Sequence, residues 1–139
     1  MIKIIMGEKG HGKTKMLIEL TNQAVNSEMG NVICIKKNKK LTYDVSHKAR
    51  LVSTSDYNVK GFNNFLAFIK GMISVNFDIS HILIDSIYKI TDCDDNEMFE
   101  NFLEEILDIS QKHNIKFTIA ASTNPDNVTD NIRRYVINT

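Results

Sequence analysis

The 139-residue sequence predicts an α/β fold, a small three-layer αβα sandwich in which helices cover both faces of a mainly parallel sheet. Two observations support this prediction. Apolar runs such as residues 32–35 are continuous, and continuous runs are typical of strands that are covered on both faces. Segments with helical spacing of apolar residues alternate with these runs. The length suits a single domain that spans residues 1–139.

The first strand and the first helix flank a glycine-rich loop. Residues 2–6 form a short apolar run that predicts a buried strand, and residues 13–28 have the apolar spacing of a helix. The loop between them consists of Gly7, Glu8, Lys9, Gly10, His11, Gly12, Lys13 and Thr14. It fits the pattern G-x-x-x-x-G-K-[ST], and strand, glycine turn and helix is the context that a phosphate-binding loop requires.

The residue types in this loop suit a nucleoside triphosphate bound with Mg²⁺. Glycines let backbone N–H groups turn inward without a Cβ in the way, and a helix that opens near Gly12 adds its unpaired N–H groups. We expect Lys13 to contact the β- and γ-phosphates and the Thr14 hydroxyl to ligate Mg²⁺. Every residue of the loop is therefore a candidate nucleotide-binding position, and we expect the His11 side chain to point outward.

The next part of the chain is less regular. Gly30 is expected to end the first helix, and residues 32–35 form the second strand. Residues 36–60 allow an antiparallel strand or a surface loop, with short strands possible at residues 41–45 and 50–54. A helix is expected from residue 58 or 61 to residue 75.

A second candidate site residue, Asp85, follows the apolar run at residues 81–84. A parallel strand delivers its last residue to the end of the sheet where the glycine-rich loop also lies. A carboxylate there can bind Mg²⁺, usually through water, so Asp85 is a candidate metal ligand. The alternative is an aspartate that only ends a strand.

The last third of the chain predicts one more helix and one more main strand. The helix spans about residues 95–113, with Asp94 or Asp95 as its cap, and the strand spans residues 115–121. Ser122 ends this strand, either as a site residue or as the start of a turn. A short helix at residues 128–135 and an edge strand at 136–137 follow. Helix C-terminal charge pairing is the expected role of Arg133 and Arg134, and an arginine finger for phosphoryl transfer is the alternative.

Composition excludes several classes of protein. Seventeen basic residues balance 17 acidic ones, so the net charge is zero, and binding to nucleic acid is not expected. The one basic cluster is interpreted as a solvated loop, with an anion or nucleic-acid contact as the alternative, and consists of Lys36, Lys37, Lys39 and Lys40. Cys34 and Cys93 lack the spacing of a zinc site, and Cys34 is expected in the core. Without an apolar stretch of membrane-spanning length or a signal peptide, a cytoplasmic location is expected.

The loop sequence G-x-x-G-x-G-K-T and the strand that ends at Asp85 resemble the P-loop NTPase superfamily, in particular its RecA, AAA+ and ABC-type branch. The whole sequence also resembles short bacterial ATP-binding proteins. These resemblances imply a parallel αβα sandwich with ATP and Mg²⁺ as ligands, and catalytic roles for Lys13 and Asp85. Ser122 resembles the sensor position, which contacts the γ-phosphate or the attacking water. Many hydrolases of this branch carry glutamate where this chain has Ser86, which argues against fast hydrolysis.

We therefore expect an ATP-binding protein with slow or partner-stimulated ATPase activity. ATP is favoured over GTP because residues 123–126 lack the lysine of the guanine-specific pattern [NT]-K-x-D. One alternative is a nucleotide-gated interaction module without turnover, which a protein partner would recognise. Another is a small nucleoside or nucleotide kinase, although such enzymes use several lid arginines and this chain has only Arg50, Arg133 and Arg134.

Overall fold

A computed structural model describes residues 1–10, 12–38 and 44–137. The described residues form a six-stranded sheet with the order β3-β2-β4-β5-β1-β6. Every pair of neighbouring strands is parallel. The strands are β1 (Ile2–Gly7), β2 (Asn31–Lys36), β3 (Arg50–Ser53), β4 (Ile79–Ile84), β5 (Lys116–Ser122) and β6 (Val136–Ile137). The predicted α/β class and the parallel sheet are confirmed.

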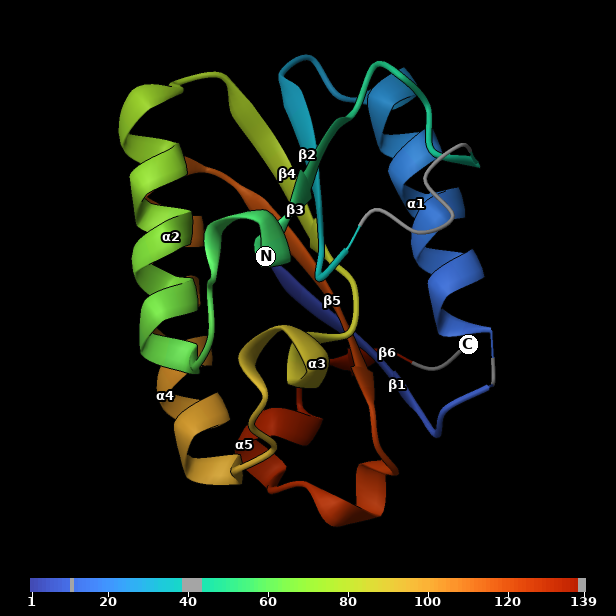
Figure 1. Ribbon diagram of the computed structural model, residues 1–139, viewed down its shortest axis with the longest axis vertical. Helices are drawn as coiled ribbons and strands as arrows, with labels where there is room; N and C mark the ends of the chain where they lie inside the picture. Colours follow the sequence, from blue (N-terminus) through green and yellow to red (C-terminus); the bar gives the residue numbers. More distant parts are fainter. Residues whose placement is uncertain (11, 39–43, 138–139) are drawn as a thin grey trace.

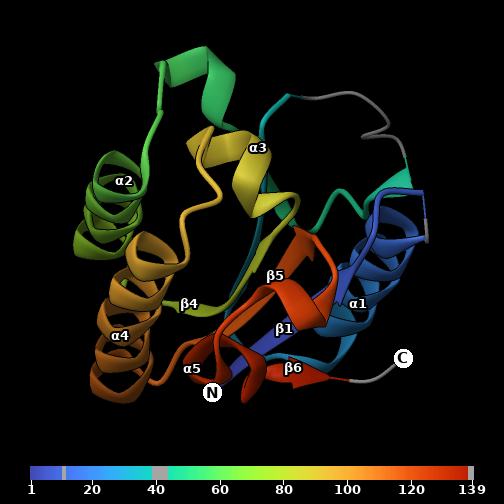
Figure 2. The same ribbon diagram turned by 90° about the horizontal axis from the view of Figure 1, so that it is seen from below.

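Helices cover both faces of this sheet. The α-helices are α1 (Lys13–Ser27), α2 (Phe62–Val75), α3 (Ile87–Thr91), α4 (Asn96–His113) and α5 (Asp130–Arg133). Two short 3₁₀ helices are η2 (Thr54–Tyr57) and η3 (Pro125–Asn127). Helix α1 lies on one face, and α2 and α4 lie together on the other (Figure 1, Figure 2). The arrangement is that of a three-layer sandwich.

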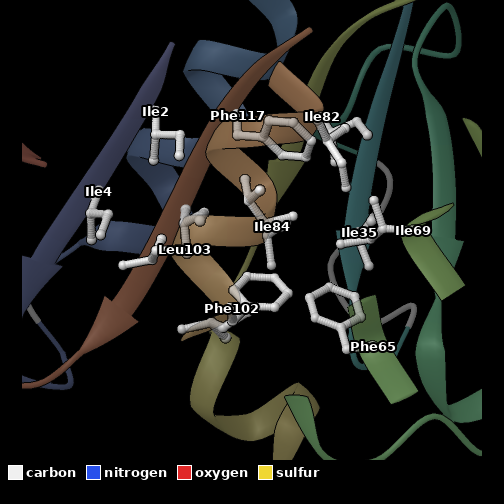
Figure 3. Packing of buried hydrophobic residues seen from close by; sticks show 14 of the residues in the cluster. Ile2, Ile4, Ile35, Phe65, Ile69, Ile82, Ile84, Phe102, Leu103 and Phe117 are labelled. Carbon is white, nitrogen blue, oxygen red and sulfur yellow. The ribbon is translucent and has the colours of Figure 1, made fainter. Parts of the chain in front are cut away.

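Two hydrophobic cores follow from the two covered faces. The larger core lies between the sheet and helices α2 and α4, where Phe65 and Phe102 stack with ring centroids 5.7 Å apart beside Ile84 (Figure 3). The smaller core packs α1 against the opposite face. Ile4 belongs to the larger core and its neighbour Ile5 to the smaller one, because successive side chains of a strand point to opposite faces. This explains why the strand sequences are continuously apolar.

The ends of the helices confirm part of the prediction. The Asp95 carboxylate accepts a hydrogen bond of 3.0 Å from the Met98 amide at the start of α4, and Asn114 ends that helix with a φ of 54°. Gly30 has a different role from the expected helix stop, since α1 already ends at Ser27. A Cβ at Gly30 would lie 2.2 Å from the Asp78 carbonyl oxygen, so close packing requires glycine there.

Two elements differ from the expectation. The strand expected at residues 50–54 is present as β3, but it pairs in parallel with β2, so the antiparallel alternative is wrong. The other possible strand falls partly on residues 41–43, which lie outside the described residues, and Asp44 and Val45 are not in a strand. Helix α3 was not predicted, because five residues are too few for a periodic pattern.

The end of the described chain matches the expected order. Helix α5 is shorter than expected, and β6 is the predicted edge strand, paired with β1. Within residues 1–10, 12–38 and 44–137, no helix is long and apolar enough to cross a membrane. Cys34 is buried in the smaller core, as expected.

Candidate functional site

The sheet topology gathers the predicted site residues at the end of the sheet where the strands terminate, here called the carboxyl end. Strand β5 lies between β1 and β4. Gly7 at the end of β1 is opposite Ser122 at the end of β5, and Ile84 on β4 is opposite Ile119. The loop that follows Gly7, the Asp85 that follows Ile84, and Ser122 therefore share one end of the fold.

Two glycines of the glycine-rich loop have positive φ angles. Gly10 and Gly12 have φ angles of 90° and 79°, a region that side chains with a Cβ rarely adopt. A Cβ at either position would meet nothing within 4 Å, so the backbone conformation and not packing requires glycine. His11 lies outside the described residues. Helix α1 begins directly after Gly12, and its first intrahelical hydrogen bond runs from the Met16 amide to the Gly12 carbonyl at 3.0 Å.

Lys13 lies over the glycine-rich loop. Its Nζ donates a hydrogen bond of 2.7 Å to the Glu8 carbonyl oxygen. Burial lowers the pKa of Lys13, the charge of Asp85 opposes that effect, and the charge of Lys89 on α3 adds to it. The Lys13 ammonium is therefore close enough to both charges to interact with them, and a bound anion would add a third and favourable interaction.

Asp85 is buried, with 6% of its surface exposed. Its amide donates to the Ile35 carbonyl at 2.9 Å, which ties Asp85 to the end of β2. Thr14 belongs to α1 and Asp85 follows β4, yet the Thr14 hydroxyl lies 3.4 Å from Asp85 Oδ1. The structure therefore brings together the two residues that the sequence predicted as Mg²⁺ ligands.

Thr14 and Asp85 offer the type of ligand atom that Mg²⁺ prefers. A hydroxyl and a carboxylate oxygen 3.4 Å apart are hard oxygen ligands, the type that Mg²⁺ prefers. In the described part of the chain, no group of three or more His, Cys, Asp or Glu side chains could hold a metal. Thr14 and Asp85 would supply two oxygen ligands to such an ion, and phosphates and water could supply the others.

Lys36 is a site residue that the sequence interpretation missed. The residue is 7% exposed, and its Nζ lies 3.8 Å from Asp85 Oδ2. The assignment of Lys36 to a solvated loop is wrong, because Lys36 is the last residue of β2 and β2 is the neighbour of β4. The available signal was its position directly after a continuous apolar run, where the argument that placed Asp85 applies equally.

Ser86 holds an uncommon backbone conformation beside Asp85. Its φ and ψ are 60° and 63°, in the left-handed region, where a residue other than glycine, asparagine or aspartate is rare. Its hydroxyl lies 3.2 Å from the same Asp85 oxygen that faces Thr14. Such strained residues cluster at functional sites, and this one sets the direction in which α3 leaves β4.

Ser122 lies at the same end of the sheet but does not join the cluster around Asp85. It lines a cavity of about 260 Å³ together with Tyr88, Asp94 and Thr123. Among the described residues, its side chain makes no hydrogen bond with Lys13, Thr14 or Asp85. The structure thus places Ser122 beside the glycine-rich loop in the sheet register but not in contact with the other predicted catalytic residues.

Arg133 has the local role that was expected. Its guanidinium pairs with Asp130 and donates to the carbonyls of Val128 and Pro125. The short helix α5 and the turn before it are held together by these bonds, which confirms charge pairing within the last helix.

Comparisons with known proteins add no family to this description. No family model matches the chain, and no curated protein matches it.

Proposed function

We propose that the protein binds ATP with Mg²⁺ at the glycine-rich loop and hydrolyses it slowly, or when a partner stimulates it. The observation that carries the proposal is the approach of Thr14 to Asp85, 3.4 Å between their oxygens, at the opening of a helix that follows two glycines in the left-handed region. A glycine-rich loop that opens a helix, a lysine and a pair of oxygen ligands is the combination that a nucleoside triphosphate with its metal requires.

Each residue has a specific role in this proposal. The loop amides and Lys13 bind the phosphates. Without nucleotide, the Lys13 ammonium donates to the neutral Glu8 carbonyl, and a charged phosphate in its place would accept a stronger hydrogen bond. Thr14 and Asp85 hold Mg²⁺, which neutralises charge on the phosphates when it is bound. Ser122 is the proposed sensor that faces the γ-phosphate from the end of β5.

The same site supports slow rather than fast hydrolysis. Ser86 stands where a glutamate would polarise the attacking water, and its hydroxyl faces Asp85. Two acidic residues that follow it have other roles, since Asp92 pairs with Lys60 at 3.2 Å and Asp95 caps α4. These observations also favour the second candidate, a nucleotide-gated interaction module without turnover.

The test is calorimetric titration with ATP, ADP and GTP, each with Mg²⁺ and with EDTA, alongside a phosphate-release assay. We expect Mg-ATP to bind, with a low rate of phosphate release. Lys13→Ala should weaken binding about 100-fold, which corresponds to about 2.7 kcal/mol. The matched control is Lys112→Ala, which removes an exposed lysine from α4 and should leave the affinity unchanged.

The outcomes separate the candidates. Equal affinity of wild type and Lys13→Ala, or no binding of any nucleotide, would overturn the proposed site. Binding without release, with or without added partners, would favour the gated module. Release at a steady rate would establish an ATPase.

A further inference from the structure

A second polar cavity lies at the carboxyl end of the sheet, on the β2 side of Asp85. Its volume is about 350 Å³, within the range of small-molecule sites. Its walls come from the chain after β2, from η2 and the residues that follow it, and from α3. The residues used below are Lys37, Ser55, Asn58, Lys60, Lys89 and Asp92. We call this the lysine cavity.

The lysine cavity is positively charged. It is lined by three lysines, Lys37, Lys60 and Lys89, and by one carboxylate, Asp92. Asp92 lies 3.2 Å from Lys60, and both side chains are well exposed, so this pair offsets only one of the three positive charges. Ser55 and Asn58 add neutral polar groups. Ammonium groups that line the same small cavity repel one another, and an anion between them would remove that repulsion.

Backbone hydrogen bonds fix the walls of the lysine cavity. The Ser55 amide donates to the Lys37 carbonyl at 2.9 Å, which joins η2 to the end of β2. The Gly61 amide donates to the Thr91 carbonyl at 2.9 Å, which joins the start of α2 to α3. The three lysines therefore come from segments that are far apart in sequence and are held together by backbone hydrogen bonds, so the fold defines the position of the cavity.

The lysine cavity adjoins the candidate nucleotide site. Lys89 belongs to α3, and its amide donates to the carbonyl of Ser86, the residue after Asp85, at 3.0 Å. Lys37 directly follows Lys36, whose ammonium faces Asp85 at 3.8 Å. A ligand in the lysine cavity would therefore lie near Asp85 and the candidate nucleotide site.

We propose that the lysine cavity binds the phosphoryl group of a second ligand, a small phosphate monoester. A dianionic group matches the excess of ammonium charge, and the volume suits a small molecule rather than a polymer. Anion binding in the cavity stands independently of the ATP site; only the placement of the second ligand beside a γ-phosphate rests on the proposed function.

The experiment uses the full chain with Lys13→Ala, so that the glycine-rich loop contributes little to anion binding. Amide chemical shifts are followed by NMR while inorganic phosphate and, separately, glycerol 3-phosphate are added. We expect saturable shifts at Lys37, Asn58, Lys60 and Lys89. A further Lys89→Gln change should weaken binding at least fivefold. The control, Lys70→Gln, removes an exposed lysine that faces Glu105 on the surface of α2 and α4, and should leave binding unchanged.

Three results would overturn the proposal. The first is a set of non-saturating shifts spread over all exposed lysines, the second is a set of shifts confined to residues 7–14, and the third is equal binding with and without Lys89→Gln. If Lys89→Gln fails to fold, Lys37→Gln takes its place. Since the test does not use ATP, loss of the proposed nucleotide site in wild type and loss of the lysine cavity are separate results.

Discussion

The two ends of the sheet contain similar polar groups but bond them differently. At the amino end, where the strands begin, Lys116 Nζ donates to Glu28 Oε1 at 2.8 Å, and His81 Nε2 lies 2.8 Å from Thr118 Oγ1. These are lengths of good hydrogen bonds. The groups line a cavity of about 260 Å³ between α1 and the sheet. One buried atom there, His81 Nδ1, has no hydrogen-bond partner among the described residues and lies 3.6 Å from Glu28 Oε1.

At the carboxyl end the contacts of Asp85 are longer. Its Oδ1 lies 3.2 Å from the Ser86 hydroxyl and 3.4 Å from the Thr14 hydroxyl, and its Oδ2 lies 3.8 Å from Lys36 Nζ. A carboxylate has about four lone-pair sites, so these contacts leave Asp85 capacity to bind another group. The comparison leads us to expect that polar groups at the amino end mainly stabilise the fold, and that the proposed ligand site lies at the carboxyl end.

The largest expected difference between the two ends concerns two glycines. Gly30→Ala places a Cβ 2.2 Å from the Asp78 carbonyl, so the backbone must move, and the free energy of unfolding should fall by about 3 kcal/mol. Gly12→Ala meets no atom within 4 Å and should cost only about 1 kcal/mol, for a left-handed residue, while it disrupts nucleotide binding. Urea unfolding and calorimetric titration measure the two effects. A larger stability loss for Gly12→Ala would contradict the comparison.

The second prediction concerns Asp85→Asn at the carboxyl end. Lys36 loses a buried carboxylate that it faces, so stability should fall by about 2 kcal/mol. The gain in ATP affinity that Mg²⁺ provides should disappear, while binding in EDTA persists. The matched control is Asp108→Asn, which changes an exposed carboxylate paired with Lys112. If the variant keeps the full Mg²⁺ effect, Asp85 only ends a strand.

Two threonines sharpen the contrast. Thr118→Val removes a buried hydroxyl that lies 2.8 Å from Nε2 of the partly buried His81, and should lower stability by about 1.5 kcal/mol without changing nucleotide affinity. Thr14→Val removes only a 3.4 Å contact and should change stability by less than about 0.5 kcal/mol, yet weaken Mg-ATP binding. Thermal unfolding with and without Mg-ATP separates the two. The opposite pattern would mean that the amino end is the ligand site.

The smallest expected effect is a pH dependence at the amino end. Burial lowers the pKa of His81 below 6.5, although the Glu28 charge opposes this and Lys116 and Lys3 add to it. His81 therefore binds a proton more readily in the unfolded chain than in the folded chain. The free energy of unfolding should fall as the pH drops below about 6.5, by at most about 1.4 kcal/mol per pH unit. Glu28 has its pKa lowered from 4.5, so its contribution is lost only at lower pH.

The measurement is urea unfolding between pH 7 and pH 5. In His81→Gln the decline in this window should be shallower than in wild type, by about 1 kcal/mol in total. His113→Gln, which changes an exposed histidine at the end of α4, is the control. An equal decline in wild type and His81→Gln would show that another group carries the dependence.

The sequence predicted most of the fold, because its main elements are long enough to show a period. The apolar runs of β1, β2, β4 and β5 and the spacing in α1, α2 and α4 were sufficient. Pairing and direction were harder, since the direction of β3 depends on the path between β2 and β3 and not on four residues of its own. Helix α3 and the strained Ser86 at its start depend on tertiary packing and leave no local pattern.

The residues of the candidate site that belong to a motif of fixed spacing were predicted from the sequence. The residues whose place in the site depends on the order of the strands were missed. Lys13, Thr14 and Asp85 follow from the glycine-rich loop and the end of an apolar run. Lys36 follows an apolar run, as Asp85 does, but their contact also depends on β2 and β4 being neighbours. The lysine cavity likewise depends on three segments that meet only in the folded chain.

The insertion of β5 between β1 and β4 has a consequence for synthesis on the ribosome. In the described sheet, β1 pairs only with β5 and β6, so Ile4 can pair with Ile119 only after β5 has been made. Among the six described strands, β1 carries the glycine-rich loop and is made first, whereas its partners β5 and β6 are made last. A nascent fragment can pair β2 with β3 and β4 before β5 emerges, but the hydrogen bonds that fix the loop to the sheet form only afterwards.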